Sequence, residues 1–320
     1  MKALTKKIDS DAVLIILLLF LIAIIAINPH KYAASSLSGL TVWATAVLPG
    51  LLPFCFITKI LSSIPKIQNL TKPLGAVTKK LYNTGGISGY IFFMSIMSGY
   101  PLGSKLTAEL FKNNMLTRGE AHRITAFSST SGPAFVLGTV SVLIGSGIGV
   151  IIFISHIIGA VLNGLLYRKV QFDKTEERTY TSQKPLNLLN DSMYNTVISC
   201  LVVGGFITVS FVFIDILLAT NILSPVITVV NMIIPGLGLP VGCGLVELTR
   251  GVIEASRLSI PSITLTALCS GLISFGGLSI HLQSMVFLKE CNISYRYFAL
   301  TKFTHAILSV GVCLLINLII

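Results

Sequence analysis

One pattern of charged residues occurs twice in this chain, both times beside apolar sequence. A positive, a negative and a second positive residue follow at steps of four and three, first as Lys105, Glu109 and Lys112 and then as Arg250, Glu254 and Arg257. Residues at these steps lie on one face of a helix. All three members reappear after a constant shift of 145 residues (250 − 105), with no insertion or deletion between them.

The same shift relates small residues outside the charged pattern. The pairs are Gly99 and Gly244, Ser129 and Ser274, and Gly132 and Gly277. Two equivalent polar regions in an apolar chain indicate two copies of one structural unit around a shared polar centre. Internal repeats of this kind are common in secondary transporters.

Composition places the chain in a membrane. Charged residues make up only 11% of it and hydrophobic residues 53%, whereas soluble domains usually contain about 25% charged residues. We therefore predict an all-α integral membrane protein surrounded by lipid bilayer. The net charge of +11 comes from basic residues in short connectors between apolar runs. Membrane topology explains these residues better than a nucleic-acid partner does.

The six cysteines are dispersed and mostly lie within apolar runs. They form neither a CxxC pair nor a cysteine–histidine spacing typical of a metal site. The chain also lacks a P-loop, a GxSxG elbow and an HExxH motif. We expect no structural disulfide, no metal, no cofactor and no catalytic residue, and we do not expect an enzyme.

The first two membrane spans are predicted at residues 12–28 and 37–62. Lys2, Lys6 and Lys7 precede the first apolar run, and a connector with four lysines and no acidic residue follows the second. Basic connectors stay in the cytoplasm, so we expect a cytoplasmic N-terminus and an uncleaved first helix.

Residues 86–113 are predicted to form a re-entrant helical hairpin. Their apolar part is short and is interrupted at residues 98–103, and basic residues follow it. Irregular backbone is tolerated at membrane depth only beside protein or a water-filled cavity. Thr117 and Glu120 have the spacing of a capping box, which begins a helix. That helix is interrupted at residues 128–133 and continues to about 145, and a further span covers 148–167.

The polar stretch 168–190 is predicted to be a cytoplasmic linker between two halves. The second half repeats the order of the first, with a span at 193–219, a hairpin at 225–257, a broken span at 262–286 and a last span at 298–320. The 37–62 span runs inward and the 193–219 span outward, so the repeats are expected to have inverted topologies. The fold is thus about seven spanning helices plus two re-entrant hairpins. Its parts are residues 1–36 with the first helix, 37–167, 168–190 and 191–320.

Four segments with helix-breaking residues are candidate parts of a substrate site. They are 98–105, 128–135, 240–251 and 274–283. A helix broken inside the membrane exposes N–H groups at the start of its second half, where carboxylates or phosphates bind favourably. The alternative is a glycine- and serine-rich face for close helix packing. Lys105 and Arg250 lie nearest the breaks and are candidates for binding an anion. Alternatively, these charges pair within their helices at the membrane surface.

The motifs SGYPLGSKLTAEL, LTRGEAHR and TSGPAF, with GLVELTRG and SFGGLS in the second half, resemble the YlbJ-type sporulation integral membrane proteins. The resemblance covers roughly residues 37–315. These proteins carry nucleoside-recognition or Gate domains, which are related to concentrative nucleoside transporters. The resemblance implies inverted Gate repeats and a bacterial cytoplasmic membrane, including the outer membrane around a forespore. Together with the helix breaks, it gives these candidate substrate-site residues: Ser98, Gly99, Tyr100, Pro101, Lys105, Ser131, Gly132, Glu247, Thr249, Arg250, Gly276 and Gly277.

Three functions remain open from the sequence. The first is a secondary transporter or permease for a small organic anion, and the resemblance implies dipicolinate in sporulation. The second is a transporter for a nucleoside or another small metabolite, for which Lys105 would be dispensable. The third is a membrane scaffold that recruits sporulation partners without transport. A homo-oligomer is compatible with each of them.

Overall fold

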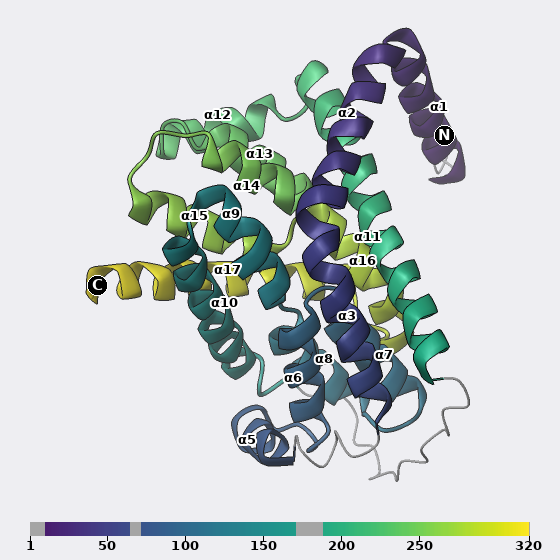
Figure 1. The fold of residues 1–320 in the computed structure, drawn as a ribbon, viewed down its shortest axis with the longest axis vertical. Helices are drawn as coiled ribbons and strands as arrows, with labels where there is room; N and C mark the ends of the chain where they lie inside the picture. Colours follow the sequence, from purple (N-terminus) through teal and green to yellow (C-terminus); the bar gives the residue numbers. More distant parts are fainter. Residues whose placement is uncertain (1–9, 65–71, 171–187, 320) are drawn as a thin grey trace, which may run out of the picture.

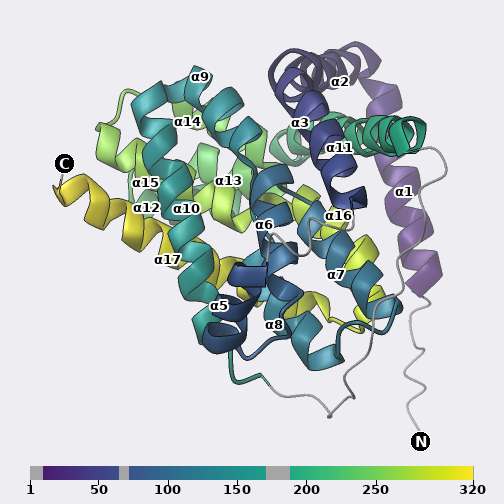
Figure 2. The same cartoon turned by 60° about the horizontal axis from the view of Figure 1, so that its bottom comes forward.

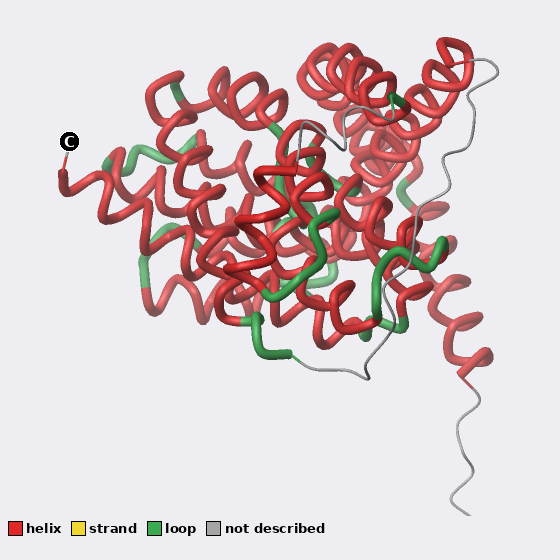
Figure 3. The backbone as a smooth tube through the Cα atoms, turned by 90° about the horizontal axis from the view of Figure 1, so that it is seen from below, coloured by secondary structure: helices red, strands yellow, loops and turns green. Residues whose placement is uncertain are grey.

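The computed structural model describes residues 10–64, 72–170 and 188–319. Helices form all the regular secondary structure in these three ranges, as the tube in Figure 3 shows. The N-terminal part contains α1 (Ser10–Ile27), α2 (Pro29–Val42), the π-helical η1 (Trp43–Val47) and α3 (Leu48–Ser63). The short helix α5 (Lys72–Tyr82) follows.

The next elements form the first predicted hairpin and the first broken helix. They are α6 (Ser88–Ser98), α7 (Leu102–Lys112), α8 (Arg118–Ser128), the π-helical η2 (Ala134–Val140) and α9 (Ser141–Ile144), followed by α10 (Ser146–Leu166). The second half contains α11 (Leu188–Ala219), α12 (Ser224–Ile233), α13 (Gly238–Val246), α14 (Leu248–Ser256), α15 (Ser262–Phe275), α16 (Gly277–Leu288), the short 3-10 helix η3 (Lys289–Cys291) and α17 (Tyr295–Ile319).

Five helical segments are long and apolar enough to cross a bilayer. They are Pro29–Leu61, Ser146–Leu166, Leu189–Ala219, Ser262–Cys291 and Tyr295–Ile319. The other two predicted spans correspond to α1, a shorter apolar helix, and to the helix interrupted between α8 and η2. The structure therefore supports the all-helical membrane fold, and the total of seven spans stays a prediction.

Two predicted boundaries were wrong. The second span begins at Pro29 instead of residue 37, because a proline without an N–H fits the first turn of a helix. The second hairpin was predicted over 225–257, but α12 is a separate helix and only α13 and α14 form the hairpin. Pro235 and Gly236, whose φ is +85°, separate α12 from α13. Most of the predicted linker 168–190 lies outside the described residues.

The order of elements in the first half recurs in the second. Shifting α7 by 145 residues gives 247–257, and α14 covers Leu248–Ser256; shifting α8 gives 263–273, within α15. Figure 1 shows α6, α7 and α8 toward one end of the molecule and α12, α13 and α14 toward the other. This placement agrees with the inverted arrangement, which remains a prediction because no bilayer defines the two sides.

The helices gather into two groups, which Figure 2 separates clearly. In one, α11 packs along α2 and α3; in the other, α17 packs against α10 and α15. The first hairpin (α6 and α7) and α16 lie between the groups. A buried apolar cluster joins the halves in the second group, and it includes Val136, Val140, Ile152, Val252 and Ile273. Large apolar side chains along α1 and α11 face outward, as expected for helices in contact with lipid.

Candidate substrate site

The first hairpin turns at residues 99–101, where its two helices end against the first broken helix. Gly99 has φ +76°, and the Tyr100–Pro101 peptide bond is cis. A Cβ on Gly99 would lie 2.5 Å from the Gly132 backbone nitrogen. Only glycine fits both this φ and this close backbone approach. The tip of the first hairpin is thus fixed to the interruption between α8 and η2.

That interruption, residues 129–133, begins after a helix with a well-defined start. The Thr117 hydroxyl accepts from the Glu120 N–H (3.1 Å), and the Glu120 carboxylate accepts from the Thr117 N–H (2.9 Å). This confirms the predicted capping box. Because α8 ends at Ser128, the carbonyl groups of its last turn and the N–H groups that follow lack helical partners.

His156 of α10 supplies one of the missing partners and connects the two halves. Its Nε2 accepts from the Ser131 N–H at 2.8 Å, and its Nδ1 lies 2.8 Å from the Ser274 hydroxyl. Since Nε2 is an acceptor, the hydrogen-bond network assigns the proton of the neutral ring to Nδ1. This buried histidine was not among the predicted site residues.

The second hairpin and the second broken helix meet in an equivalent way. Glu247 separates α13 from α14, and its carboxylate accepts from the Arg250 N–H at 2.7 Å, as an N-cap. Gly276 and Gly277 have φ +88° and +68°, and a Cβ on Gly277 would lie 2.7 Å from the Gly244 carbonyl oxygen. These two predicted glycines pack the break between α15 and α16 onto the hairpin.

A small cavity of about 60 Å³ lies where both hairpins and both breaks converge. The structure brings seven of the predicted residues together in its lining: Ser98, Gly99, Tyr100, Ser131, Gly132, Glu247 and Thr249. Ser279 and Gln283 of α16 line it as well. Hydroxyl, amide and backbone groups dominate its polar lining, beside a single carboxylate.

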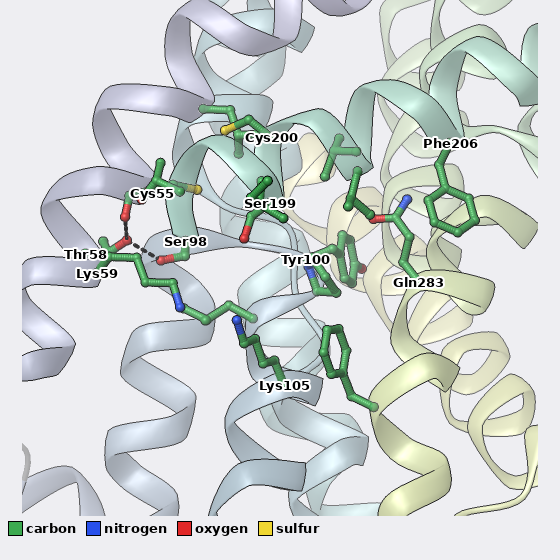
Figure 4. A pocket seen from close by; sticks show the side chains of 18 of the residues that line it. Cys55, Thr58, Lys59, Ser98, Tyr100, Lys105, Ser199, Cys200, Phe206 and Gln283 are labelled. Carbon is green, nitrogen blue, oxygen red and sulfur yellow. Dashed lines mark hydrogen bonds between the residues drawn. The ribbon is translucent and has the colours of Figure 1, made fainter. Parts of the chain in front are cut away.

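A larger cavity of about 250 Å³ adjoins the first and shares Ser98, Tyr100 and Gln283 with it. It lies between α3, the first hairpin, α11 and α16. The predicted residues Pro101 and Lys105 line it, together with Lys59, which the sequence analysis did not select. Figure 4 shows the side chains of Lys59 and Lys105 reaching toward one another at one end. The Thr58 hydroxyl, beside Lys59, accepts from the Ser98 hydroxyl at 2.6 Å.

Three predicted residues line neither cavity: Arg250, Gly276 and Gly277. The two glycines contribute through packing. Arg250 instead bonds Glu254 at 2.8 Å, lies 3.5 Å from Asp215 of α11, and covers the Phe211 ring. The Glu254 contact matches the alternative in which the repeated charges pair within their helices, whereas the contact with Asp215 joins two helices and was not predicted.

Lys302 of α17 is a further buried residue that the sequence analysis missed. Its Nζ donates to the Tyr100 hydroxyl at 2.6 Å and to the Ser129 carbonyl at 2.8 Å. A lone lysine in an apolar span was the available signal, because ionisable residues inside membranes are usually functional. Lys302 therefore connects the last span to the first hairpin and to the first break.

The chain has relatives among known proteins. No protein-family model matches it. The sporulation integral membrane protein YlbJ of Bacillus subtilis is 26% identical over an alignment 320 positions long, which covers 90% of this chain and 78% of YlbJ. The resemblance to YlbJ-type proteins is confirmed. Similarity to YlbJ over most of both chains includes the hairpins and breaks described above.

The fold has a counterpart among solved structures. A doubly substituted variant of CNTnw in an outward-facing state superimposes with a TM-score of 0.57, covering 93% of this chain and 86% of CNTnw. The two sequences are 13% identical, so the likeness concerns the fold alone. Together, YlbJ and CNTnw support an integral membrane protein with a fold like that of CNTnw.

Proposed function

We propose that this protein is a secondary transporter for a small organic anion, with dipicolinate as the specific substrate. The observation that carries the proposal is the pair of lysines, Lys59 and Lys105, in the larger cavity. Two ammonium groups that face one another repel, and a bound dianion relieves that repulsion. Dipicolinate is a planar aromatic ring with two carboxylates, and therefore matches two cations in one cavity.

The N-terminus of α7 also favours an anion in the larger cavity. Pro101 and Leu102, at the start of α7, line the same cavity as Lys105. A helix N-terminus carries positive partial charge and free N–H groups, which favour carboxylates. Phe206 and Phe287 also line the cavity and offer apolar contact to an aromatic ring. These features support an aromatic carboxylate over an inorganic anion.

We take the cellular setting of the proposal from YlbJ. YlbJ is named as a sporulation protein, which supports a role in a membrane around the forespore, with the N-terminus in the cytoplasm. Residues 1–36, 37–167, 168–190 and 191–320 are proposed as the first helix, first repeat, linker and second repeat. In this arrangement each hairpin opens from its own side of the membrane, which gives alternating access to the cavity.

A specific observation also favours a second substrate class, namely nucleosides. The smaller cavity is lined by neutral hydroxyl and amide groups, including Ser131, Thr249, Ser279 and Gln283. Such groups suit the hydroxyls and base edges of a nucleoside, and CNTnw, by its name, belongs among concentrative nucleoside transporters. For this substrate Lys59 and Lys105 are dispensable.

The experiment that separates the two classes is equilibrium binding to the purified protein. Dipicolinate and uridine are titrated against wild type, Lys59→Gln and Lys105→Gln, with Lys112→Gln as a matched control on the exposed side of α7. Each cavity variant should weaken dipicolinate binding by about tenfold or more, equivalent to about 1.4 kcal/mol, whereas Lys112→Gln should not. If the protein binds uridine with the same affinity in wild type, Lys59→Gln and Lys105→Gln, and does not bind dipicolinate, the substrate is a nucleoside instead.

A further inference from the structure

Lys302 places a basic amino group in the interior of the protein. Only 1% of its surface is exposed. Its Nζ donates to Tyr100 and to Ser129, and it lies 4.5 Å from the centre of the Tyr100 ring. No salt bridge involves Lys302 in the described residues, where the bridges are those of Arg250 and Arg257. An ammonium buried without a carboxylate partner is costly, so this amino group is a candidate for one that changes its charge.

The amino group of Lys302 lies at the C-terminal end of a half-helix. Ser129 directly follows Ser128, the last residue of α8, so its carbonyl belongs to the C-terminal end of a half-helix. Such an end carries negative partial charge. In secondary transporters, unwound carbonyls and half-helix C-termini hold the coupling cation. Here the Nζ of the protein's own Lys302 lies against such a carbonyl.

The ionisable groups around Lys302 come from three elements besides α17. They are Tyr100 at the first hairpin, His156 on α10 and His281 on α16, with His305 on α17 itself. Each histidine already has a backbone partner: His156 accepts from Ser131, His281 donates to Phe275, and His305 donates to the His156 carbonyl. Tyr100 donates to the Ile273 carbonyl at 3.1 Å. None of these groups is a carboxylate that neutralises the ammonium.

We propose that Lys302 replaces an inorganic coupling cation and links transport to protons. This inference rests on the proposed transport function. Unlike arginine, lysine can lose its charge by releasing one proton. In the proposed step, the Nζ–H bond breaks, Nζ keeps the electron pair, and the Tyr100 hydroxyl, which accepts from Nζ, takes up this proton while it releases its own to water in the cavity that it lines. The proton returns from water on the other side of the membrane later in the cycle.

Proton release has a defined structural consequence. The neutral amine attracts the Ser129 carbonyl and the Tyr100 ring less strongly, because both contacts are strengthened by the positive charge. Since Tyr100 lines both cavities, a change at Lys302 is transmitted to the first hairpin. The protonation state of Lys302 therefore sets how firmly this hairpin is held against α17.

The test uses the full-length protein in liposomes with radiolabelled dipicolinate. Two assays are compared: counterflow exchange, which needs no driving ion, and net accumulation driven by a gradient of either pH or sodium. Wild type should accumulate dipicolinate with a pH gradient in sodium-free buffer. Lys302→Met and Lys302→Arg should retain counterflow but lose accumulation by about tenfold or more, and exposed Lys289→Met should behave as wild type.

The outcomes distinguish the two proposals. Counterflow without any pH-driven accumulation in wild type, or pH-driven accumulation that persists in Lys302→Met and Lys302→Arg, would overturn the role of Lys302. Absence of counterflow in wild type would reject the transport of dipicolinate. In that case, thermal unfolding across a pH series decides on Lys302: a pH-dependent step absent from Lys302→Met supports its titration, and coincident profiles refute it.

Discussion

The backbone of Gly99 lies directly against the backbone of Gly132. A Cβ on Gly132 would lie 2.9 Å from the Gly99 nitrogen, so the first hairpin touches the first break without an intervening side chain. The equivalent residues after the shift of 145, Gly244 and Gly277, make the same kind of contact in the second half. The internal repeat therefore extends from the sequence to the contacts that hold each hairpin tip in place.

The first prediction concerns this contact. Gly132→Ala should lower the free energy of unfolding by about 1–3 kcal/mol, because the added methyl group meets backbone atoms that have no space to move. It should also weaken binding of a nucleoside, for which the smaller cavity is the proposed site, since Gly132 lines that cavity. Thermal unfolding in detergent and a binding titration measure the two effects. The control is Gly205→Ala, where the new Cβ meets nothing within 4 Å; equal behaviour of the two variants would contradict the packing argument.

A second prediction concerns Arg250. Arg250→Gln should destabilise the protein by about 1–3 kcal/mol, because Asp215 and Glu254 then lose a charged donor. Its effect on dipicolinate affinity should be smaller than that of Lys105→Gln, since Arg250 lines neither cavity. Arg257→Gln is the control, as that side chain is 66% exposed. Adding Asp215→Asn to Arg250→Gln should recover part of the lost stability, and no recovery would argue against the ion pair.

His156 leads to a third prediction. His156→Leu removes the acceptor of the Ser131 N–H and the partner of the Ser274 hydroxyl, and should cost about 1–3 kcal/mol. Ser274→Ala removes only one partner and should cost less. Thermal unfolding compares the two variants. If Ser274→Ala were the more damaging, the backbone contact at the first break would not be the main contribution of His156.

The helix breaks were predictable because glycine, proline and serine act locally. Gly99, Pro101 and Gly132 interrupt apolar runs, and the interruption alone indicated a hairpin and a broken helix. The repeated spacing then identified the equivalent breaks in the second half. Seven of the predicted site residues line the smaller cavity for this reason. The start of the second hairpin was predicted less accurately. The short turn between α12 and α13 does not interrupt the apolar pattern, so the sequence did not show that α12 is a separate helix.

The partners of the buried charges were not predictable in the same way. Lys302 meets Tyr100 across 202 residues of sequence, and Asp215 meets Arg250 from a different helix. Such pairs depend on how helices pack, which a single sequence does not specify. Lys59 lies inside the predicted span 37–62 and was not among the predicted site residues, yet it lines the larger cavity. Tertiary packing thus places Lys59 near Lys105 in the larger cavity, whereas Arg250, the other predicted anion-binding cation, lines neither cavity.

The last prediction tests the inverted topology. Single cysteines are placed at Lys79, Arg168 and the exposed Gly236 in a cysteine-free background, and are labelled from one side with a membrane-impermeant maleimide. Lys79→Cys and Arg168→Cys should react from the cytoplasmic side, because basic residues surround both positions. Gly236→Cys should react only from the opposite side, as it lies between α12 and α13, at the other end of the molecule from α6 to α8. If Lys79→Cys and Arg168→Cys reacted from different sides, the first repeat would cross the membrane a different number of times and the inverted relationship would be lost.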